Sequence, residues 1–265
     1  METIDEITFN RFRQANHESL RNVQRDYELL LQRCVEIVRP DVVSPVVSLP
    51  IKLYTLLQVG ARRALELTEA TIRELNAGSF VPLFLLSRAT FETAVLMLDT
   101  AARAEETARR NAANDLLKLD AQVDNMLFSV SRRSSSLQRL ASDNRIGKVI
   151  HRVSKSVGTD LHIMYANLSE YAHPNMPGML GAYSRGFEGG SRDLRLGGSP
   201  VVMGAAHWAS TALFGLEMAL NLMHHALDTH AKVETELRRV SERVAFENGL
   251  WPSGVPYPPD GGDVA

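Results

Sequence analysis

Prolines and glycines divide this chain into long segments in which apolar residues otherwise recur every three or four positions. Pro40, Pro45 and Pro50 form one division, Asn76-Ala77-Gly78 forms another, and Pro174 begins a third. Proline cannot continue a helix, and a helix commonly ends at asparagine or glycine. Aromatic residues make up only 6% of the chain, which disfavours sheets. The sequence therefore predicts an all-α fold, a helical bundle of about five to seven helices.

The predicted helices follow the apolar spacing between these divisions. In the first helical segment, apolar side chains from Leu20 to Val38 are spaced three and four apart. Ser79 and Asp160 each stand directly before a helical segment, where a side-chain oxygen can cap unpaired backbone N–H groups. All the helices belong to one domain, residues 1–250. We expect helices over residues 8–39, 51–75, 80–103, 104–131, 145–156, 161–172 and 201–248.

A glycine-rich loop, residues 174–200, is inserted before the long last helix and holds seven of the seventeen glycines. Loops of this length in compact domains often serve a function. This one has room for a small hairpin between Ala182-Tyr183-Ser184 and Leu194-Arg195-Leu196. Proline and glycine dominate the chain from Trp251, so we expect residues 251–265 to be a disordered tail.

Composition excludes several classes of protein and site. The single cysteine, Cys34, leaves no internal disulfide and no cysteine-based zinc site. The start of the chain is acidic, and the most apolar stretch, residues 80–98, is interrupted by Arg88 and Glu92. We therefore expect no signal peptide, no membrane span and a cytoplasmic location. Nucleotide-binding and nucleophile-elbow motifs are missing from the sequence, and no cofactor or metal is predicted.

Polar side chains of several chemical types gather at the end of the segment 161–172. Glu170 and His173 are three residues apart and share a helical face, and Asn175 follows Pro174. The helix macrodipole favours the protonated form of a histidine at this end, so His173 could be tuned for proton transfer. The alternative is structural, with His173 capping the last carbonyl groups and bracing the turn at Pro174.

A second polar group interrupts the apolar helix 80–103. Arg88, Glu92 and Asp99 fall on one face of it, which suggests that they line a cleft or are partly buried. Buried charges are costly, and proteins often retain them for function. The alternative is an ordinary ion pair between residues four apart on a solvated face, and periodicity does not separate the two.

Two further patterns bear on ligands. Residues 132–155 contain seven Lys or Arg and one acid, Asp143, which could form a phosphate-binding surface or a plain solvated helix. A di-metal carboxylate site in a bundle wants two Glu-x-x-His pairs and two further glutamates. The sequence has one such pair, Glu170 with His173, and the other candidate ligands are Glu66, Glu92, Glu217 and His224.

Two short motifs are Arg88-Ala89-Thr90-Phe91-Glu92 and residues 168–175, Leu-Ser-Glu-Tyr-Ala-His-Pro-Asn. In these motifs the chain resembles uncharacterised bacterial all-helical proteins that are distantly similar to the HEPN superfamily, and the resemblance covers about residues 50–230. Many HEPN proteins are metal-independent endoribonucleases of defence and toxin–antitoxin systems, and they are often dimeric. Their site pairs an arginine with a histidine four to six residues later. His173 matches that histidine, whereas residues 166–169 supply no arginine.

The resemblance implies an RNA-directed protein, an endoribonuclease or a degenerate relative, in bacterial defence or stress response. His173 would transfer protons, Arg88 beside Glu92 would stabilise phosphate from another helix, and Glu170 or Asn175 would orient the histidine. We also expect a homodimer, from the resemblance and because residues 201–227 are apolar nearly all round the helix. Two alternatives remain open: a non-catalytic bundle that binds a ligand or protein, and a di-iron carboxylate oxygenase.

Overall fold

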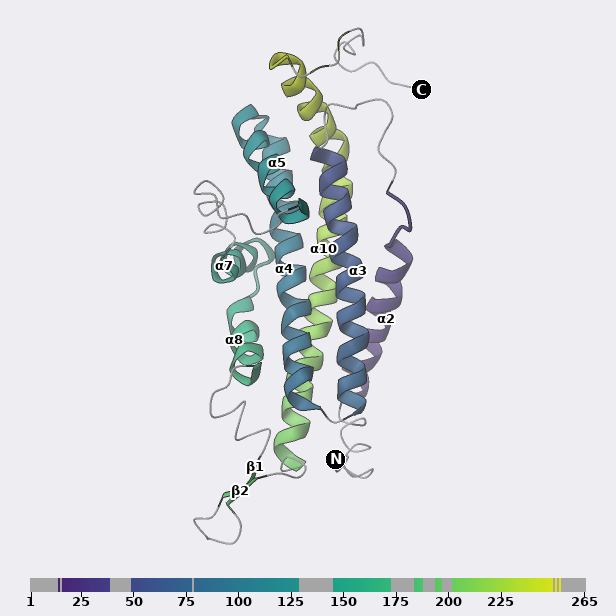
Figure 1. Ribbon diagram of the computed structural model, residues 1–265, viewed down its shortest axis with the longest axis vertical. Helices are drawn as coiled ribbons and strands as arrows, with labels where there is room; N and C mark the ends of the chain where they lie inside the picture. Colours follow the sequence, from purple (N-terminus) through teal and green to yellow (C-terminus); the bar gives the residue numbers. More distant parts are fainter. Residues whose placement is uncertain are drawn as a thin grey trace.

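The computed structural model describes residues 14, 16–38, 49–77, 79–128, 145–172, 184–187, 194–196, 202–249, 251 and 253. Over these ranges the chain forms seven α-helices and two short strands, which confirms the expected all-α bundle (Figure 1). In chain order the elements are α2 (His17–Arg33), α3 (Leu49–Asn76), α4 (Phe80–Arg110), α5 (Ala113–Phe128), α7 (Ile146–Val157), α8 (Leu161–Ala172), β1 (Ser184–Phe187), β2 (Leu194–Leu196) and α10 (Val202–Glu247).

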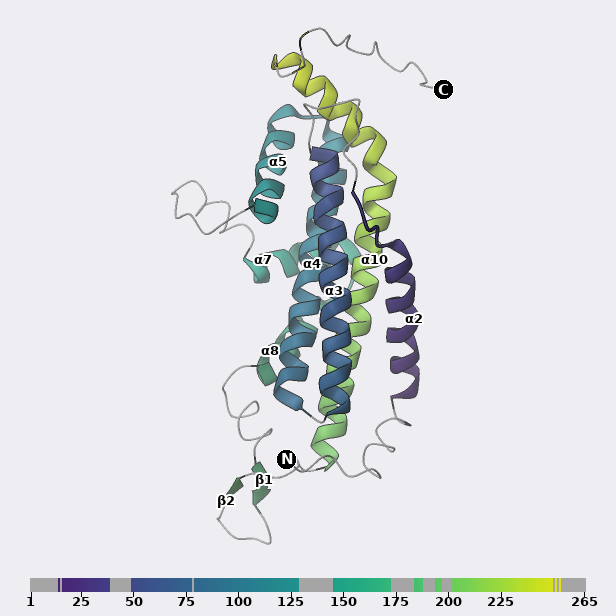
Figure 2. The same cartoon turned by 45° about the vertical axis from the view of Figure 1, so that its right-hand side comes forward.

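Three long helices, α3, α4 and α10, lie side by side along the long axis of the molecule and form its centre (Figures 1 and 2). The shorter helices cover them: α2 packs on α10 and α3, α7 and α8 pack on α4, and α5 packs on α3 and α4. Leucine and alanine side chains fill the space between the helices, together with the fully buried Phe84 and Phe91. The core is therefore shared by all the long helices.

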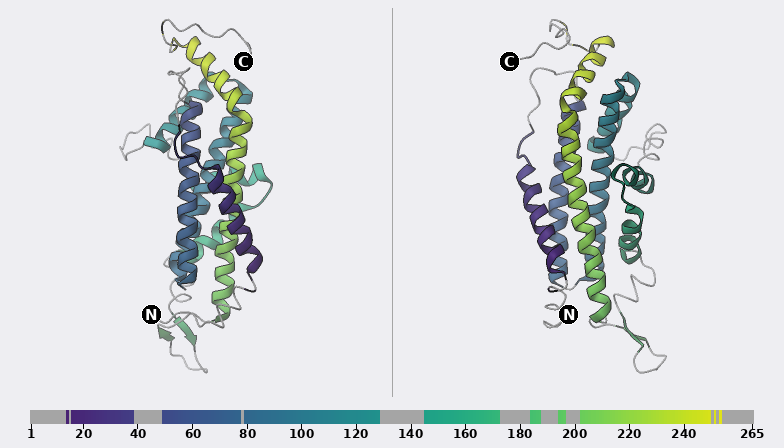
Figure 3. Two further views of the ribbon diagram at one scale, coloured as in Figure 1. Left: turned by 90° about the vertical axis from the view of Figure 1, so that its right-hand side faces the viewer. Right: turned by 180° about the vertical axis from the view of Figure 1, so that it is seen from behind.

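Other helices surround the long helix α10 and bury the apolar residues around most of its circumference. Seen from behind, α10 lies between α2 on one side and α7 and α8, beyond α4, on the other (Figure 3). Leu213, Leu216, Leu220 and Met223 are fully buried beneath these neighbours. Packing within one chain thus buries most of the apolar surface of α10 from Ala209 onward. The expected homodimer therefore rests on the family resemblance and not on this surface.

The predicted boundary between the third and fourth helices, at residues 103 and 104, is wrong. Helix α4 continues to Arg110 and ends at Asn111, whose backbone is left-handed with φ of 55°. Asparagine tolerates this conformation and often ends helices in it. Arg243 of α10 holds the turn, because its guanidinium donates to the Asn111 carbonyl oxygen at 2.9 Å and to Asn111 Oδ1 at 2.8 Å. Ser79 precedes α4 as expected, but its side chain forms no capping hydrogen bond.

The first helix ends at Arg33, six residues before its predicted end. The buried Gln58 of α3 replaces the helical hydrogen bonds there: its Oε1 accepts from the Val35 N–H at 2.9 Å, and its Nε2 donates to the Arg33 carbonyl oxygen at 3.3 Å. At Cys34 the backbone is extended. A contact between helices thus overrides the apolar periodicity that continues to Val38.

The turn between α7 and α8 forms as the sequence predicts. Gly158 takes a left-handed backbone with φ of 68°. The Asp160 carboxylate accepts from the His162 N–H at 2.9 Å, and the Ser154 hydroxyl accepts from the Leu161 N–H at 3.1 Å. These contacts satisfy donors that the start of α8 would otherwise leave unpaired.

A small hairpin is present within the glycine-rich segment. Strands β1 and β2 pair antiparallel, with Ser184 opposite Leu196 and Phe187 opposite Leu194. The second strand is as predicted, whereas the first begins at Ser184 rather than ending there. The remainder of the loop 174–200, and the tail except for residues 251 and 253, lie outside the described residues.

Within the described chain, α4 is the one helix long and apolar enough to cross a membrane by length and composition alone, over Val81–Arg110. Central helices of soluble bundles have the same composition. Helices α3, α5, α7, α8 and α10 all pack against α4. This arrangement is compatible with a soluble protein, and the cytoplasmic location stays a prediction.

Candidate nucleic-acid interface

Arg88 and Glu92 form a partly buried cluster on α4 with a residue that the sequence did not suggest, Tyr165 of α8. The Arg88 Nε donates to Glu92 Oε1 at 2.8 Å, and a terminal nitrogen of Arg88 donates to the Tyr165 hydroxyl at 2.9 Å. The guanidinium carbon also lies 5.2 Å from the centre of the Tyr165 ring, within reach of a cation–π interaction. The cluster therefore fastens α8 to α4.

Electrostatics keep Arg88 charged. Burial by itself lowers the pKa of Arg88, but the hydrogen bond and negative charge of Glu92, with Tyr165, raise that pKa above its usual value. A charged guanidinium would suit phosphate, as the resemblance implies. Glu92 and Tyr165 already engage donors of this guanidinium, however, so an incoming phosphate would have to compete with them.

The other predicted site residues do not join this cluster within the described chain. Glu170 is exposed on the last turn of α8. His173 and Asn175 lie outside the described residues, so their roles stay predictions. Helix α8 is fixed near this end by Tyr171, whose ring packs against Phe84 with centroids 4.8 Å apart. The structure thus brings together Arg88 and Glu92 and leaves the proposed partners of His173 untested.

Asp99, which the sequence groups with Arg88 and Glu92, has a different partner. Its buried carboxylate accepts two hydrogen bonds from Arg152 of α7, each 2.7 Å long. Paired, parallel hydrogen bonds of this kind are among the strongest that side chains form. Asp99 therefore anchors α7 on α4 rather than lining a cleft.

With Arg152 turned inward, the exposed face of α7 is basic. Lys148, His151 and Lys155 are exposed, and α7 contains no acidic residue. The His151 ring lies 5.9 Å from the ring of His162, which is exposed on the first turn of α8. Lys148, His151, Lys155 and His162 are called the α7 basic face below. The expected phosphate-binding surface over residues 132–155 is described only from Arg145 onward.

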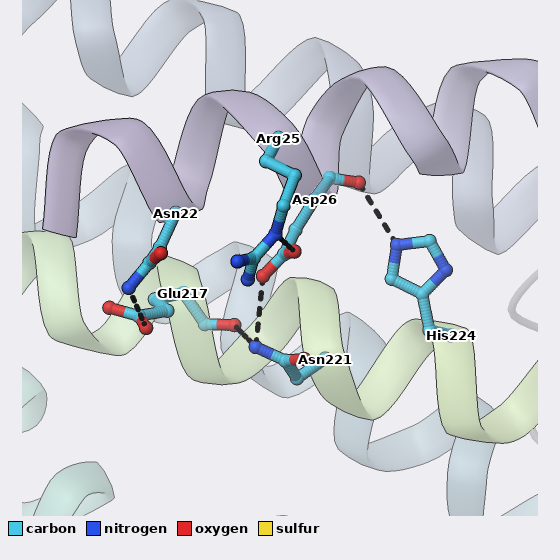
Figure 4. A network of polar contacts seen from close by, with 6 residues as sticks. All are labelled: Asn22, Arg25, Asp26, Glu217, Asn221 and His224. Carbon is cyan, nitrogen blue, oxygen red and sulfur yellow. Dashed lines mark hydrogen bonds and ion pairs between the residues drawn. The ribbon is translucent and has the colours of Figure 1, made fainter. Parts of the chain in front are cut away.

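A second polar network joins α2 to α10 (Figure 4), on the opposite side of the bundle from α7 and α8 (Figure 3). The carboxylate of Asp26, which is buried, accepts from Asn221 at 3.0 Å, and the Asp26 backbone carbonyl is 2.9 Å from the Nε2 atom of His224. With its proton on Nε2, His224 donates to that carbonyl and leaves Nδ1 facing the Arg33 guanidinium at 3.3 Å. The network comprises Asn22, Arg25, Asp26, Glu217, Asn221 and His224.

This network gives Glu217 and His224 structural partners. Asn22 of α2 donates to Glu217 Oε1 at 2.9 Å, and His224 faces the α2 backbone. In the described ranges no three His, Cys, Asp or Glu side chains are close enough together to hold a metal ion. The described candidate ligands of the di-metal centre therefore do not come together as a metal site.

Comparison of the chain with protein-family models, with curated proteins and with solved structures gives no match in any of the three. The resemblance to the HEPN superfamily thus depends on the short motifs around Arg88 and His173 alone.

Proposed function

We propose that this protein is an RNA-directed helical bundle that binds single-stranded RNA on the α7 basic face. The observation that carries the proposal is an acid-free helix whose exposed positions hold Lys148, His151 and Lys155 while its one inward arginine is fixed to Asp99. Phosphate contacts of this kind supply most of the affinity in sequence-independent binding.

The spacing of the face suits an extended strand. Lys148 and Lys155 are seven residues apart on one side of α7, which places them about 10 Å apart along its axis, a span of a few phosphates. The neighbouring rings of His151 and His162 offer flat surfaces on which unpaired bases can stack. Exposed Ile163 on the same turn of α8 adds an apolar contact.

The salt dependence of RNA binding tests the proposal. Each lysine that neutralises a phosphate of a single strand contributes about −0.7 to the slope of log K against log salt concentration. Lys148→Gln combined with Lys155→Gln should therefore make the slope shallower by about 1.4 and weaken binding at low salt. Fluorescence anisotropy of a labelled single-stranded RNA, measured over a series of salt concentrations, gives both quantities.

A matched control removes two lysines from other surfaces. Lys118 of α5 and Lys232 of α10 are both exposed, and Lys118→Gln with Lys232→Gln changes the net charge by the same amount. The control should keep the wild-type slope. An equal loss in both double variants would mean that RNA responds to net charge alone and would refute the assignment to α7.

The finer form of the hypothesis, a metal-independent endoribonuclease, assigns proton transfer to His173 and phosphate stabilisation to Arg88. Purified protein is incubated with a mixed RNA pool in chelator, alongside His173→Ala at matched helicity by circular dichroism. Cleavage by the wild type and not by the variant supports this chemistry. Cleavage that survives in the variant removes His173 from it, and intact RNA with both proteins leaves a binding function without catalysis.

A further inference from the structure

A cavity of about 650 Å³ lies between the first half of α2 and the last part of α3. Sites for small organic ligands usually have volumes of roughly 300–1,000 Å³, an apolar lining and a few polar groups. The cavity therefore has the size of such a site. Its lining residues are His17, Leu20, Arg21, Val23, Gln24, Tyr27, Thr68, Glu69 and Ile72.

The floor of this α2–α3 cavity is apolar. Leu20 and Val23 of α2 and Ile72 of α3 line it; Val23 is buried and the other two are partly buried. The hydroxyl of the buried Thr68 already has an acceptor, because it donates to the Ala64 carbonyl oxygen of its own helix at 2.8 Å. An apolar ligand body would thus replace water on the floor without leaving a buried polar group unpaired.

The rim of the cavity is polar, and its two sides differ in charge. His17, Arg21 and Gln24 are spaced along one edge of α2, and Arg21 is exposed and forms no ion pair with any described residue. On the α3 side the one charge is Glu69, and the phenol of Tyr27 donates a hydrogen bond to its carboxylate. The hydrogen bond to Glu69, with burial, raises the pKa of Tyr27 to about 12, so the phenol remains a donor.

We propose that the α2–α3 cavity binds a small amphipathic molecule with an anionic head group, such as a carboxylate or sulfonate. The apolar body lies on Leu20, Val23 and Ile72, and the head group receives hydrogen bonds from Arg21. An anion suits the α2 edge because its guanidinium is uncommitted, whereas the negative charge of the α3 edge already has a donor in Tyr27.

This site is separate from the α7 basic face. Helix α2 covers α10 and α3, whereas α7 and α8 cover α4 on the other side of the central layer (Figures 1 and 3). Loss of RNA binding and loss of ligand binding can therefore be told apart by separate variants.

Two fluorescent probes with nearly the same ring skeleton test the proposal. Anilinonaphthalene sulfonate is anionic, and phenylnaphthylamine lacks the sulfonate, and the fluorescence of both rises in apolar sites. Titration of the folded protein should show saturable binding of both probes, tighter for the sulfonate. Arg21→Gln should weaken the sulfonate about tenfold, the effect of one lost charge-assisted hydrogen bond, and leave phenylnaphthylamine unchanged.

Filling the cavity should remove both probes. Gln24 is exposed and lines the cavity, so Gln24→Trp adds bulk without disturbing the core, and Leu20→Trp fills it independently. The matched controls are Arg109→Gln on α4 and Gln32→Trp on α2, both at exposed positions outside the lining. Urea unfolding followed by circular dichroism checks that each variant is folded.

The outcomes are distinct. Probe binding that survives both tryptophan variants, or that is absent from the wild type, overturns the site. Sulfonate binding that is equally strong in Arg21→Gln and in Arg109→Gln overturns the anionic head group.

Discussion

Two arginine–carboxylate pairs in this protein have the same geometry and opposite burial. Arg152 donates two hydrogen bonds of 2.7 Å to Asp99, and Arg239 donates two of 2.9 and 2.7 Å to Glu236. The Asp99 side chain is 5% exposed, whereas the Glu236 side chain is 43% exposed. Replacing each arginine by alanine therefore compares a buried pair that joins α7 to α4 with a solvated pair between residues three apart on α10.

Arg152→Ala leaves the Asp99 carboxylate buried without its cationic partner. Breaking a fully buried pair in this way costs about 3–5 kcal/mol. The Arg152 side chain is 38% exposed, so water reaches one side of the pair and we expect the lower end, about 3 kcal/mol. Arg239→Ala removes a solvated pair, and such pairs contribute up to about 0.5 kcal/mol.

Equilibrium urea unfolding, followed by circular dichroism, measures both losses in free energy of unfolding. Asp99→Asn in the Arg152→Ala background should recover about 1 kcal/mol or more, because it removes the unpaired buried charge. If Arg152→Ala costs no more than Arg239→Ala, burial does not govern the strength of these pairs. The role of Asp99 as the anchor of α7 would then be wrong as well.

Two other predictions concern packing and titration. Gly60→Ala should destabilise the protein by about 1–3 kcal/mol in urea unfolding, because its Cβ would lie 2.5 Å from the Sδ of the buried Met97. Gly147→Ala, whose Cβ meets nothing within 4 Å, should instead stabilise it by about 0.5–1 kcal/mol. Tyr27 should ionise near pH 12 rather than 10, and tyrosinate absorbance should lose this late step in Tyr27→Phe. Because the folded pKa is the higher one, the contribution of the hydrogen bond to Glu69 is present below pH 10 and disappears as the pH rises through 12.

The parts of the fold that local chemistry determines could be predicted from the sequence. Helix α8 has its predicted bounds, and α3, α7 and α10 begin and end within two residues of theirs. Gly158 and Asp160 explain the turn before α8 because each acts on backbone within three residues of itself. The two errors at helix ends arise where residues far away in the sequence determine where the helix ends. Arg243 fixes the end of α4 across 132 positions, and Gln58 ends α2 from the next helix.

The candidate sites show the same limit. The spacing of Arg88 and Glu92 predicts their ion pair, because residues four apart are neighbours on any helix. Tyr165 and Arg152 come from other helices, and the register between helices cannot be read from periodicity within one of them. The cavity residues Arg21 and Glu69 look like ordinary solvated positions in the sequence, and only the meeting of α2 with α3 makes them a rim.

Helices α2 and α8, which each carry part of a proposed binding surface, contact the same turn of α10. A Cβ at Gly215 would lie 3.0 Å from Leu168 of α8, and Glu217 accepts a hydrogen bond from Asn22 of α2. Contact through one rigid helix does not by itself couple two sites, because coupling needs a second arrangement that each ligand favours differently. Leu168 packs so closely against Gly215 that an added Cβ would lie 3.0 Å from it, and such tight packing resists a shift of α8. We therefore expect a saturating anionic probe to leave the RNA dissociation constant unchanged, and RNA to leave the probe constant unchanged. A reciprocal shift of equal size in both constants would reveal a second packing of α2 or α8 on α10.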